Sequence, residues 1–326
     1  MTNIALINNL PTLLLCTIYM FMGPALIMVN KYILSSLDFP YPMFLSGLGV
    51  LVSGLVAHAL VRVGYVTLNR KDTIEGILWY KRVLPVGLAH AGTLAFGNTV
   101  YMYLNVGFIQ MLKSFTPVVM MVVSYLANID MPSSPVVWSI VIIALGTAAT
   151  CSFTPELNMI GLAIMFMSEA TEAIRLILTQ FFLQNLKFGV VEGQYVLAPA
   201  SAFWLFLASF IYEFKTMYEK DAFYIILSNP LIFVTASVMG LCINFLSYLV
   251  IQSTSSLTMK VLGTMRNIFT IFLGVTFYAE IVSRNELLGY IVALIGFVCY
   301  NVAKSGYWDR LPLVLPVAIH GKDVPT

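Results

Sequence analysis

Long apolar runs separated by short polar stretches make up most of this chain of 326 residues. A helix needs about 20 apolar residues to cross the hydrocarbon core of a bilayer. Ten runs approach that length, and Pro230 predicts a turn within the eighth. Their ranges are 11–33, 41–62, 83–104, 106–126, 135–152, 158–183, 191–212, 224–252, 254–279 and 286–304. The pattern predicts an all-α polytopic membrane protein with ten transmembrane helices.

The composition agrees with this pattern, since 60% of the residues are hydrophobic and only 10% are charged. A soluble domain has about 25% charged residues and could not hide so much apolar surface. The lipid bilayer is therefore the expected partner of the outer surface. The four cysteines lie inside apolar runs without metal-binding spacing, so we expect no disulfide framework. The first basic residue is Lys31, and no Arg- and Ser-rich transit segment is expected.

The basic residues between the runs predict the orientation, because cytosolic loops are enriched in Lys and Arg. With a cytosolic N-terminus, the cytosolic side holds Arg62, Arg70, Lys71, Lys81, Arg82, Lys187, Lys304, Arg310 and Lys322. The opposite side holds only Lys215, Lys220 and Arg284. We therefore expect both termini in the cytosol, with residues 305–326 as a cytosolic tail.

The two halves of the chain resemble each other weakly. The matches are Val141–Gly146 with Ile291–Gly296 and Asp130 with Glu280, both 150 residues apart, and Met20–Met22 with Met165–Met167, 145 residues apart. Apolar helices can match by chance, but the acidic position shared at one offset favours a repeat. Five spans are an odd number, so the second half would enter from the opposite side. This predicts two inverted five-helix repeats, residues 1–152 and 153–304.

Five basic residues fall inside the predicted spans: Lys31, Lys113, Arg175, Lys260 and Arg266. A charge at membrane depth costs at least ~2.5–3.5 kcal/mol, so it usually faces a polar interior. Lys113 and Arg266 have no acid three or four residues away on their own helices. A substrate anion is the preferred partner for both, and Glu169 on another helix is the alternative. Lys260 would guide anions inward or snorkel to the interface.

Two other charged positions have simpler interpretations. Glu172 and Arg175 are three residues apart and can pair on one helix face, or contact the substrate. Lys31 lies near a span end, where we expect it to snorkel to the interface. The excess of cations at depth favours an anionic substrate such as a phosphate ester, since Arg offers a fork and Lys a point charge to phosphate.

Polar side chains on two spans could recognise the rest of a substrate. Asn98 and Tyr101 share one helix face, as do Asn244, Ser247 and Tyr248 at i, i+3 and i+4. Hydrogen bonding between helices is the alternative for each of them, because it is common for such residues in membranes.

Five segments carry a family resemblance: Gly97–Asn98, Phe108–Pro117, Glu172–Gln180, Ser256–Asn267 and Asn285–Lys304, which contains a Tyr-Asn-x-x-Lys ending. They are similar to segments of the triose-phosphate and nucleotide-sugar transporter group of the drug/metabolite transporter superfamily. The second resembles its fourth helix, the fourth its ninth helix and the last its final helix. The resemblance covers nearly the whole chain and agrees with ten spans.

The resemblance implies strict antiport of phosphorylated compounds, with no enzymatic activity and no metal or cofactor. Plastid triose-phosphate members hold phosphate with a lysine in the fourth helix and a Lys-Arg pair in the ninth. The matching positions here are Lys113 and Arg266-Asn267, so the second cation of the pair is missing. Ile109-Gln110 replaces a histidine-containing motif of those members.

These departures favour the endomembrane branch of the group. We expect exchange of a nucleotide sugar for a nucleoside monophosphate across the Golgi or endoplasmic reticulum membrane. Alternatives are a triose-phosphate/phosphate-type exchanger and a proton-coupled exporter that uses Glu169. A membrane enzyme ranks low, because the three histidines are scattered. No nucleic-acid partner is expected, and monomer and homodimer are both open.

The loop charges generate a topology prediction. Cysteines introduced at positions 70 and 220 should react with impermeant thiol reagents from opposite sides of the membrane. Labelling of both positions from one side would reject the predicted orientation.

Overall fold

The computed structural model describes residues 10–66, 68, 79–126, 133–153, 158–180, 189–253, 256–279 and 282–304. Every regular element in these ranges is helical. The long helices are α2 (Leu10–Lys31), α3 (Pro42–Arg62), α4 (Leu84–Thr99), α7 (Ser134–Phe153), α8 (Met159–Gln180), α9 (Val190–Tyr212), α12 (Pro230–Ser253), α13 (Ser256–Tyr278) and α14 (Arg284–Lys304). The short elements are η1 (Tyr32–Ser36), η3 (Trp79–Val83), η4 (Val100–Met102), α5 (Val106–Leu112), η5 (Lys113–Phe115), α6 (Thr116–Leu126), α10 (Phe214–Glu219) and α11 (Ala222–Ser228).

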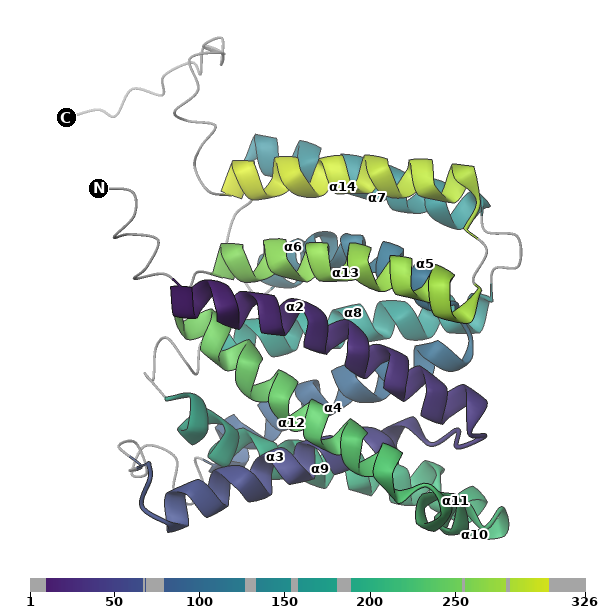
Figure 1. Ribbon diagram of the computed structural model, residues 1–326. Helices are drawn as coiled ribbons and strands as arrows, with labels where there is room; N and C mark the ends of the chain where they lie inside the picture. Colours follow the sequence, from purple (N-terminus) through teal and green to yellow (C-terminus); the bar gives the residue numbers. More distant parts are fainter. Residues whose placement is uncertain are drawn as a thin grey trace, which may run out of the picture.

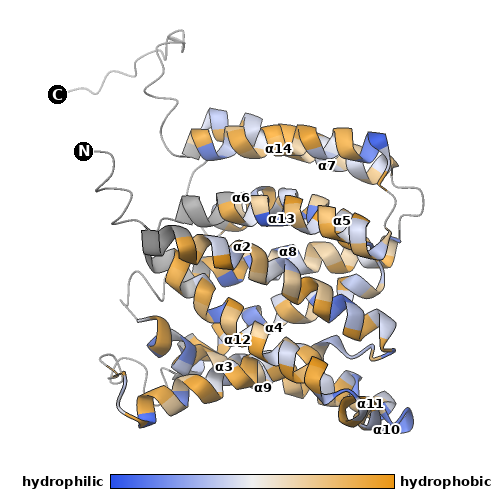
Figure 2. Ribbon diagram, in the orientation of Figure 1, coloured by the Kyte–Doolittle hydropathy of each residue, from blue (hydrophilic) through white to orange (hydrophobic). Residues whose placement is uncertain are grey.

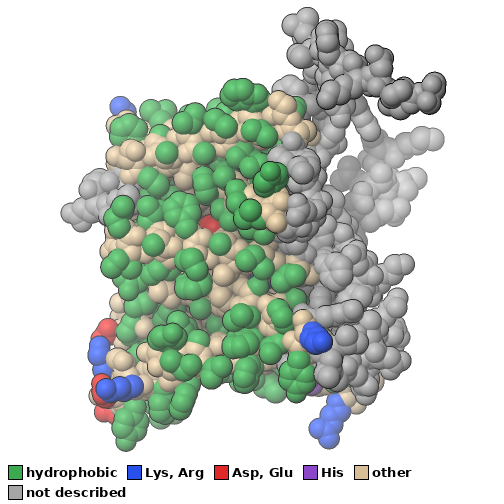
Figure 3. Space-filling model, turned by 180° about the vertical axis from the view of Figure 1, so that it is seen from behind, with side chains coloured by type: hydrophobic (Ala, Val, Ile, Leu, Met, Phe, Trp, Pro, Cys, Tyr) green, Lys and Arg blue, Asp and Glu red, His purple; other side chains and the backbone are tan. Residues whose placement is uncertain are grey.

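The long helices stack in layers, with α7 and α14 at the top of the stack and α3 and α9 at the bottom (Figure 1). Helix α2 begins, and α14 ends, on the left of this view, so both ends of the bundle lie on one side. Apolar residues run along most helices (Figure 2). From behind, hydrophobic side chains cover most of the described surface, and charged side chains gather near its edges (Figure 3).

Each predicted apolar range contains a helix in the described part of the chain. The turn expected before Pro230 is present, since α11 ends at Ser228 and α12 begins at Pro230. Among the described residues, seven helices are long and apolar enough to cross a membrane. The predicted spans outside this set correspond to α4, α8 and α13. Helix α4 is short, and α8 carries Glu169, Glu172 and Arg175. The chain is therefore an all-α, multi-pass membrane protein.

Charged residues near the helix ends accept hydrogen bonds from backbone N–H groups that have no partner within the helix. Ser283 and Glu286 form a capping box at the start of α14, in which the Ser283 N–H donates to Glu286 at 2.6 Å. Glu213, which follows α9, accepts the N–H groups of Met43 and Phe44 at 2.8 and 2.9 Å. Burial raises the pKa of Glu213, although these donors oppose the shift.

The helix boundaries recur 150 residues apart. Helices α7 and α14 begin at 134 and 284, and α3 and α9 end at 62 and 212. The match of Met20–Met22 at 145 residues therefore does not follow the register of the helices. The predicted pair Asp130 and Glu280 lies outside the described residues.

Contacts between α7 and α14 follow the same spacing. A Cβ atom on Gly146 would lie 2.4 Å from the Ala293 nitrogen, and one on Gly296 would lie 2.8 Å from the Ile143 nitrogen. Gly146 and Gly296 are 150 residues apart, and so are Ile143 and Ala293. The contact is therefore reciprocal, and only glycine allows the two backbones to approach so closely.

The first and second halves of the chain are interleaved. Helix α2 of the first half packs on α12 and α13, while α8 of the second half packs on α4 and α6. The pairs α3–α9, α5–α13 and α7–α14 also join the halves. Each half therefore packs its first helix against the other half.

The α7–α14 contact generates a stability prediction. Gly146→Ala should lower the free energy of unfolding by about 1–3 kcal/mol or more, because its methyl group would meet backbone rather than a flexible side chain. The measurement is the melting temperature of the purified protein in detergent.

Gly263→Ala is the matched control, because a Cβ atom at Gly263 meets nothing within 4 Å. It should leave the melting temperature unchanged or raise it, since alanine favours helix. Equal melting temperatures for the two variants would contradict the proposed role of the α7–α14 contact.

Candidate functional site

Lys113 lies at a break in its helix that the sequence itself causes. Pro117 has no N–H group to bond the Lys113 carbonyl, and its ring crowds that carbonyl. The chain accordingly forms the turn η5 between α5 and α6. The Thr116 hydroxyl donates instead to the Lys113 carbonyl at 2.6 Å. The break positions Lys113 inside the bundle, where its side chain is half-buried.

Glu169 on α8 faces this break. Its side chain is 4% exposed and makes a short hydrogen bond with the Thr116 hydroxyl. That hydroxyl has a single hydrogen, and both the Lys113 carbonyl and Glu169 lie within hydrogen-bonding distance. Both bonds form at once when Glu169 carries a proton and donates to Thr116. The geometry thus accommodates a neutral Glu169.

Lys113 lies close enough to Glu169 and Glu172 to interact electrostatically with both carboxylates. Among the described residues, however, the Lys113 ammonium makes no hydrogen bond or ion pair. It therefore stabilises negative charge nearby without being committed to one partner. A buried amine in that situation can accept an incoming anion.

Glu172 and Arg175 form the ion pair that their spacing allows. Arg175 donates from Nε and Nη2 to the two carboxylate oxygens of Glu172, at 2.8 and 2.6 Å. His90 on α4 interacts electrostatically with both residues and hydrogen-bonds with the Ser201 hydroxyl at 3.0 Å. The sequence reasoning missed His90 as part of this cluster, and its only signal was a lone histidine within an apolar run.

Arg266 on α13 lies against α2. Its Nη1 donates to the Tyr19 hydroxyl at 2.8 Å, and its Cζ lies 5.3 Å from the centre of the Tyr19 ring. The Nε atom is buried and has no hydrogen-bond partner within the described part of the chain. An unpaired buried donor costs about 1–3 kcal/mol, and more when charged. Tyr19 was not predicted from sequence, because tyrosines are frequent in this chain and none stands out.

Asn267 and Lys260 are the two other predicted site residues of α13. The Oδ1 atom of Asn267 is buried and accepts no hydrogen bond from the described residues, so this oxygen is available to a donor group of a ligand. Lys260 belongs to α13, but its side chain lies outside the described residues.

Asn98 and Tyr101 each make side-chain hydrogen bonds near the end of α4. Asn98 donates to the Ser46 hydroxyl at 2.7 Å and accepts from Asn30 at 3.3 Å. The Tyr101 hydroxyl accepts from Gln110 at 3.3 Å. The bonds between helices that the sequence left as an alternative are thus present.

Lys31 makes a contact within the bundle that the sequence did not predict. Its ammonium donates to the Tyr101 carbonyl at 2.5 Å, so it ties the end of α2 to η4 rather than only snorkelling to the interface. The carbonyl is accessible because η4 is a short 3-10 turn, which leaves some carbonyls without helical partners.

Asn244 on α12 donates to the Ser53 hydroxyl on α3 at 3.1 Å. This bond joins the two halves of the chain. Ser247 donates to the Ile243 carbonyl of its own helix at 2.7 Å, and the side chain of Tyr248 lies outside the described residues. Within the described ranges, no group of three or more His, Cys, Asp and Glu side chains could hold a metal ion.

The site residues therefore form two groups. Lys113, Glu169, Glu172 and Arg175 lie around η5 and α8, while Arg266 lies at the contact of α13 with α2. Chemically, the groups offer cations and uncommitted polar atoms in an apolar surrounding. That arrangement suits a polar anion and contains no evident nucleophile–base pair.

Known proteins resemble this chain over most of its length. A probable sugar phosphate/phosphate translocator of Arabidopsis thaliana is 31% identical over 292 residues, which cover 88% of this chain and 76% of that protein. A second protein of the same description and organism is 32% identical over 88% of this chain and 78% of its own length. A GDP-mannose transporter of Arabidopsis thaliana is 24% identical, over 88% of this chain and 84% of its own length.

A solved crystal structure has a similar fold, with a TM-score of 0.53 at 13% identity. The likeness covers 90% of this chain and 98% of the other. The sequence also matches the Triose-phosphate Transporter family over residues 10–301. The match includes η5 with Lys113 and α13 with Arg266, and it covers far more than half of the chain. This chain therefore belongs to the Triose-phosphate Transporter family.

Proposed function

We propose that this protein exchanges one phosphorylated organic anion for another phosphate-bearing anion across an internal membrane. In this proposal Lys113 and Arg266 hold the phosphate, with Asn267 beside them. The observation that carries it is the buried Nε donor of Arg266, which has no partner among the residues that the structure describes. A phosphate oxygen would satisfy that donor and neutralise the charge in the same step.

The substrate has two candidate classes. Sugar phosphates against phosphate come first, because relatives that are 31% and 32% identical have that description. Nucleotide sugar against nucleoside monophosphate, the expectation from sequence, comes second. It is supported by the replacement of a second cation by Asn267 and by the 24% identical GDP-mannose transporter.

The architecture that we propose for exchange is ten spans arranged as two inverted five-helix repeats. It is supported by the helix boundaries 150 residues apart and by the reciprocal contact of Gly146 and Gly296. Lys113 belongs to the first repeat and Arg266 to the second. Rocking of one repeat against the other would then expose the phosphate site to each side in turn.

The orientation with both termini in the cytosol is also part of the proposal. It is supported by the position of the start of α2 and the end of α14 on one side of the bundle. An even number of spans places both ends of a chain on the same side of the membrane. The loop charges favour the cytosol for that side.

The phosphate site generates a binding prediction. Lys113→Ala and Arg266→Ala should each weaken the binding of inorganic phosphate and sugar phosphates by at least tenfold. The reason is that a hydrogen bond to a charged group contributes about 1.5–3 kcal/mol. Arg266→Lys should also weaken binding, because a point charge replaces a two-pronged donor. The measurement is the ligand-induced rise in melting temperature of the purified variants.

Lys215→Ala is the control, since Lys215 is a cation on the exposed surface of α10. It should bind as the wild type does. The competing idea is that Glu169 neutralises these cations for folding alone. In that case the site variants would melt earlier without ligand yet keep normal affinity, and the phosphate site would be rejected.

Proton coupling through Glu169 is the second candidate function. It is favoured by the geometry at Thr116, which accommodates a protonated carboxyl. Counterflow of labelled phosphate in liposomes separates the two functions. We expect counterflow without any pH gradient, and a strict requirement for a gradient would favour the proton-coupled exporter.

A further inference from the structure

The guanidinium of Arg266 has two different edges. Nη1 lies on the same side as Cδ, while Nε–H and one N–H of Nη2 point together to the opposite side. Such a pair of parallel donors can bind two oxygens of one phosphate, as can the pair of Nη1 and Nη2 at the end of the group. Which donors face the neighbouring helix therefore decides which pair is left to hold phosphate with two bonds.

The contacts of Arg266 with α2 settle which edge is free. A Cβ atom on Gly23 would lie 2.6 Å from Cδ of Arg266, 3.2 Å from its Nη1 and 3.4 Å from its Nε. Nη1 also donates to Tyr19. Cδ and Nη1 thus lie nearest to α2, and the N–H of Nε points to the side opposite Cδ. Among the described residues, only Tyr19 accepts a hydrogen bond from this guanidinium.

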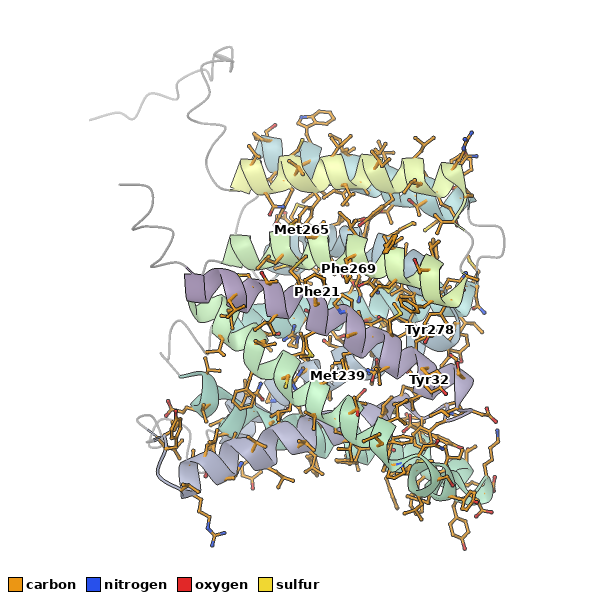
Figure 4. All side chains as sticks on the ribbon, in the orientation of Figure 1. Phe21, Tyr32, Met239, Met265, Phe269 and Tyr278 are labelled. Atoms are coloured by element: carbon orange, nitrogen blue, oxygen red, sulfur yellow. The ribbon has the colours of Figure 1, made fainter. Side chains whose placement is uncertain are left out.

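Tyr19 lies on the inner side of the contact between α2 and α13. Residues two apart on a helix point roughly 200° apart. Phe21 is 56% exposed on the outer side, while Tyr19 is 4% exposed. Phe21 packs edge-to-face on Phe269 of α13, with ring centres 5.2 Å apart, and Figure 4 shows the two side by side. The aromatic pair closes the outside of the contact, so Tyr19 and Arg266 meet inside it.

The contact between Glu169 and Thr116 is equivalent to the contact between Tyr19 and Arg266. Tyr19 and Glu169 are 150 residues apart, and so are Thr116 and Arg266. Tyr19 bonds Arg266, and Glu169 bonds Thr116. In both contacts a side chain of the first helix of one half holds a residue that belongs to the other half. This repetition argues against a chance contact of Tyr19.

From these contacts we propose that Tyr19 and Gly23 are positioning residues of the phosphate site. Tyr19 fixes the guanidinium through Nη1, and Gly23 leaves room for it against the backbone of α2. The Nε–Nη2 edge is then held ready for two oxygens of a tetrahedral oxyanion. The inference rests on the proposed function and deepens it, because it assigns two residues of α2 to phosphate recognition.

The test compares exchange kinetics of full-length variants in liposomes, with labelled inorganic phosphate as the probe. Tyr19→Phe keeps the ring but removes the hydroxyl, and Gly23→Ala displaces the guanidinium. Each should raise the KM for phosphate roughly five- to tenfold, with a maximal exchange rate within about twofold of the wild type. A merely structural role would instead reduce the maximal rate through loss of active protein.

Tyr290→Phe is the matched control, because Tyr290 on α14 is 3% exposed, much like Tyr19. It should leave the KM unchanged. An unchanged KM in both Tyr19→Phe and Gly23→Ala, in a protein whose wild type exchanges phosphate, would overturn this inference alone. The inference would also be overturned if Tyr290→Phe raised the KM equally. A wild type that neither binds nor exchanges phosphate would overturn the proposed function, and this inference with it.

Discussion

The arrangement of this bundle depends on the cost of placing charges where there is little water. A charged group at membrane depth must face a partner, a polar cavity or a ligand. Arg175 meets that condition with Glu172 through two hydrogen bonds. Lys113 and Arg266 do so incompletely, since each keeps donors that the described residues do not satisfy. An anion that bound to these donors would lower the free-energy cost of burying the two cations.

The residues that surround Lys113 and Arg266 come from both halves of the chain, because the two halves are interleaved. Helix α2 supplies Tyr19 to Arg266 of the second half, and α8 supplies Glu169 to Thr116 of the first. Each contact crosses between halves that would have to move relative to one another during alternating access. In the proposed mechanism, binding of phosphate and the contact of the halves are linked through Arg266.

Much of the fold could be predicted from the sequence. Apolar runs of sufficient length indicate membrane helices, because backbone groups in lipid must be bonded within the segment. The break at Lys113 follows from Pro117 and the turn before α12 from Pro230, since proline lacks an N–H group. Pairing of Glu172 with Arg175 follows from their spacing on one helix.

The sequence by itself thus determined the class of protein, the position of its helices and the cations that stand out within them. Tertiary structure decided which partners these cations have. Tyr19 is 247 residues from Arg266, and Lys31 reaches a carbonyl 70 residues away. Periodicity along one helix identifies its buried face but not the helix that covers it. The orientation of the Arg266 guanidinium, and with it the geometry of the candidate site, could therefore come only from the packed bundle.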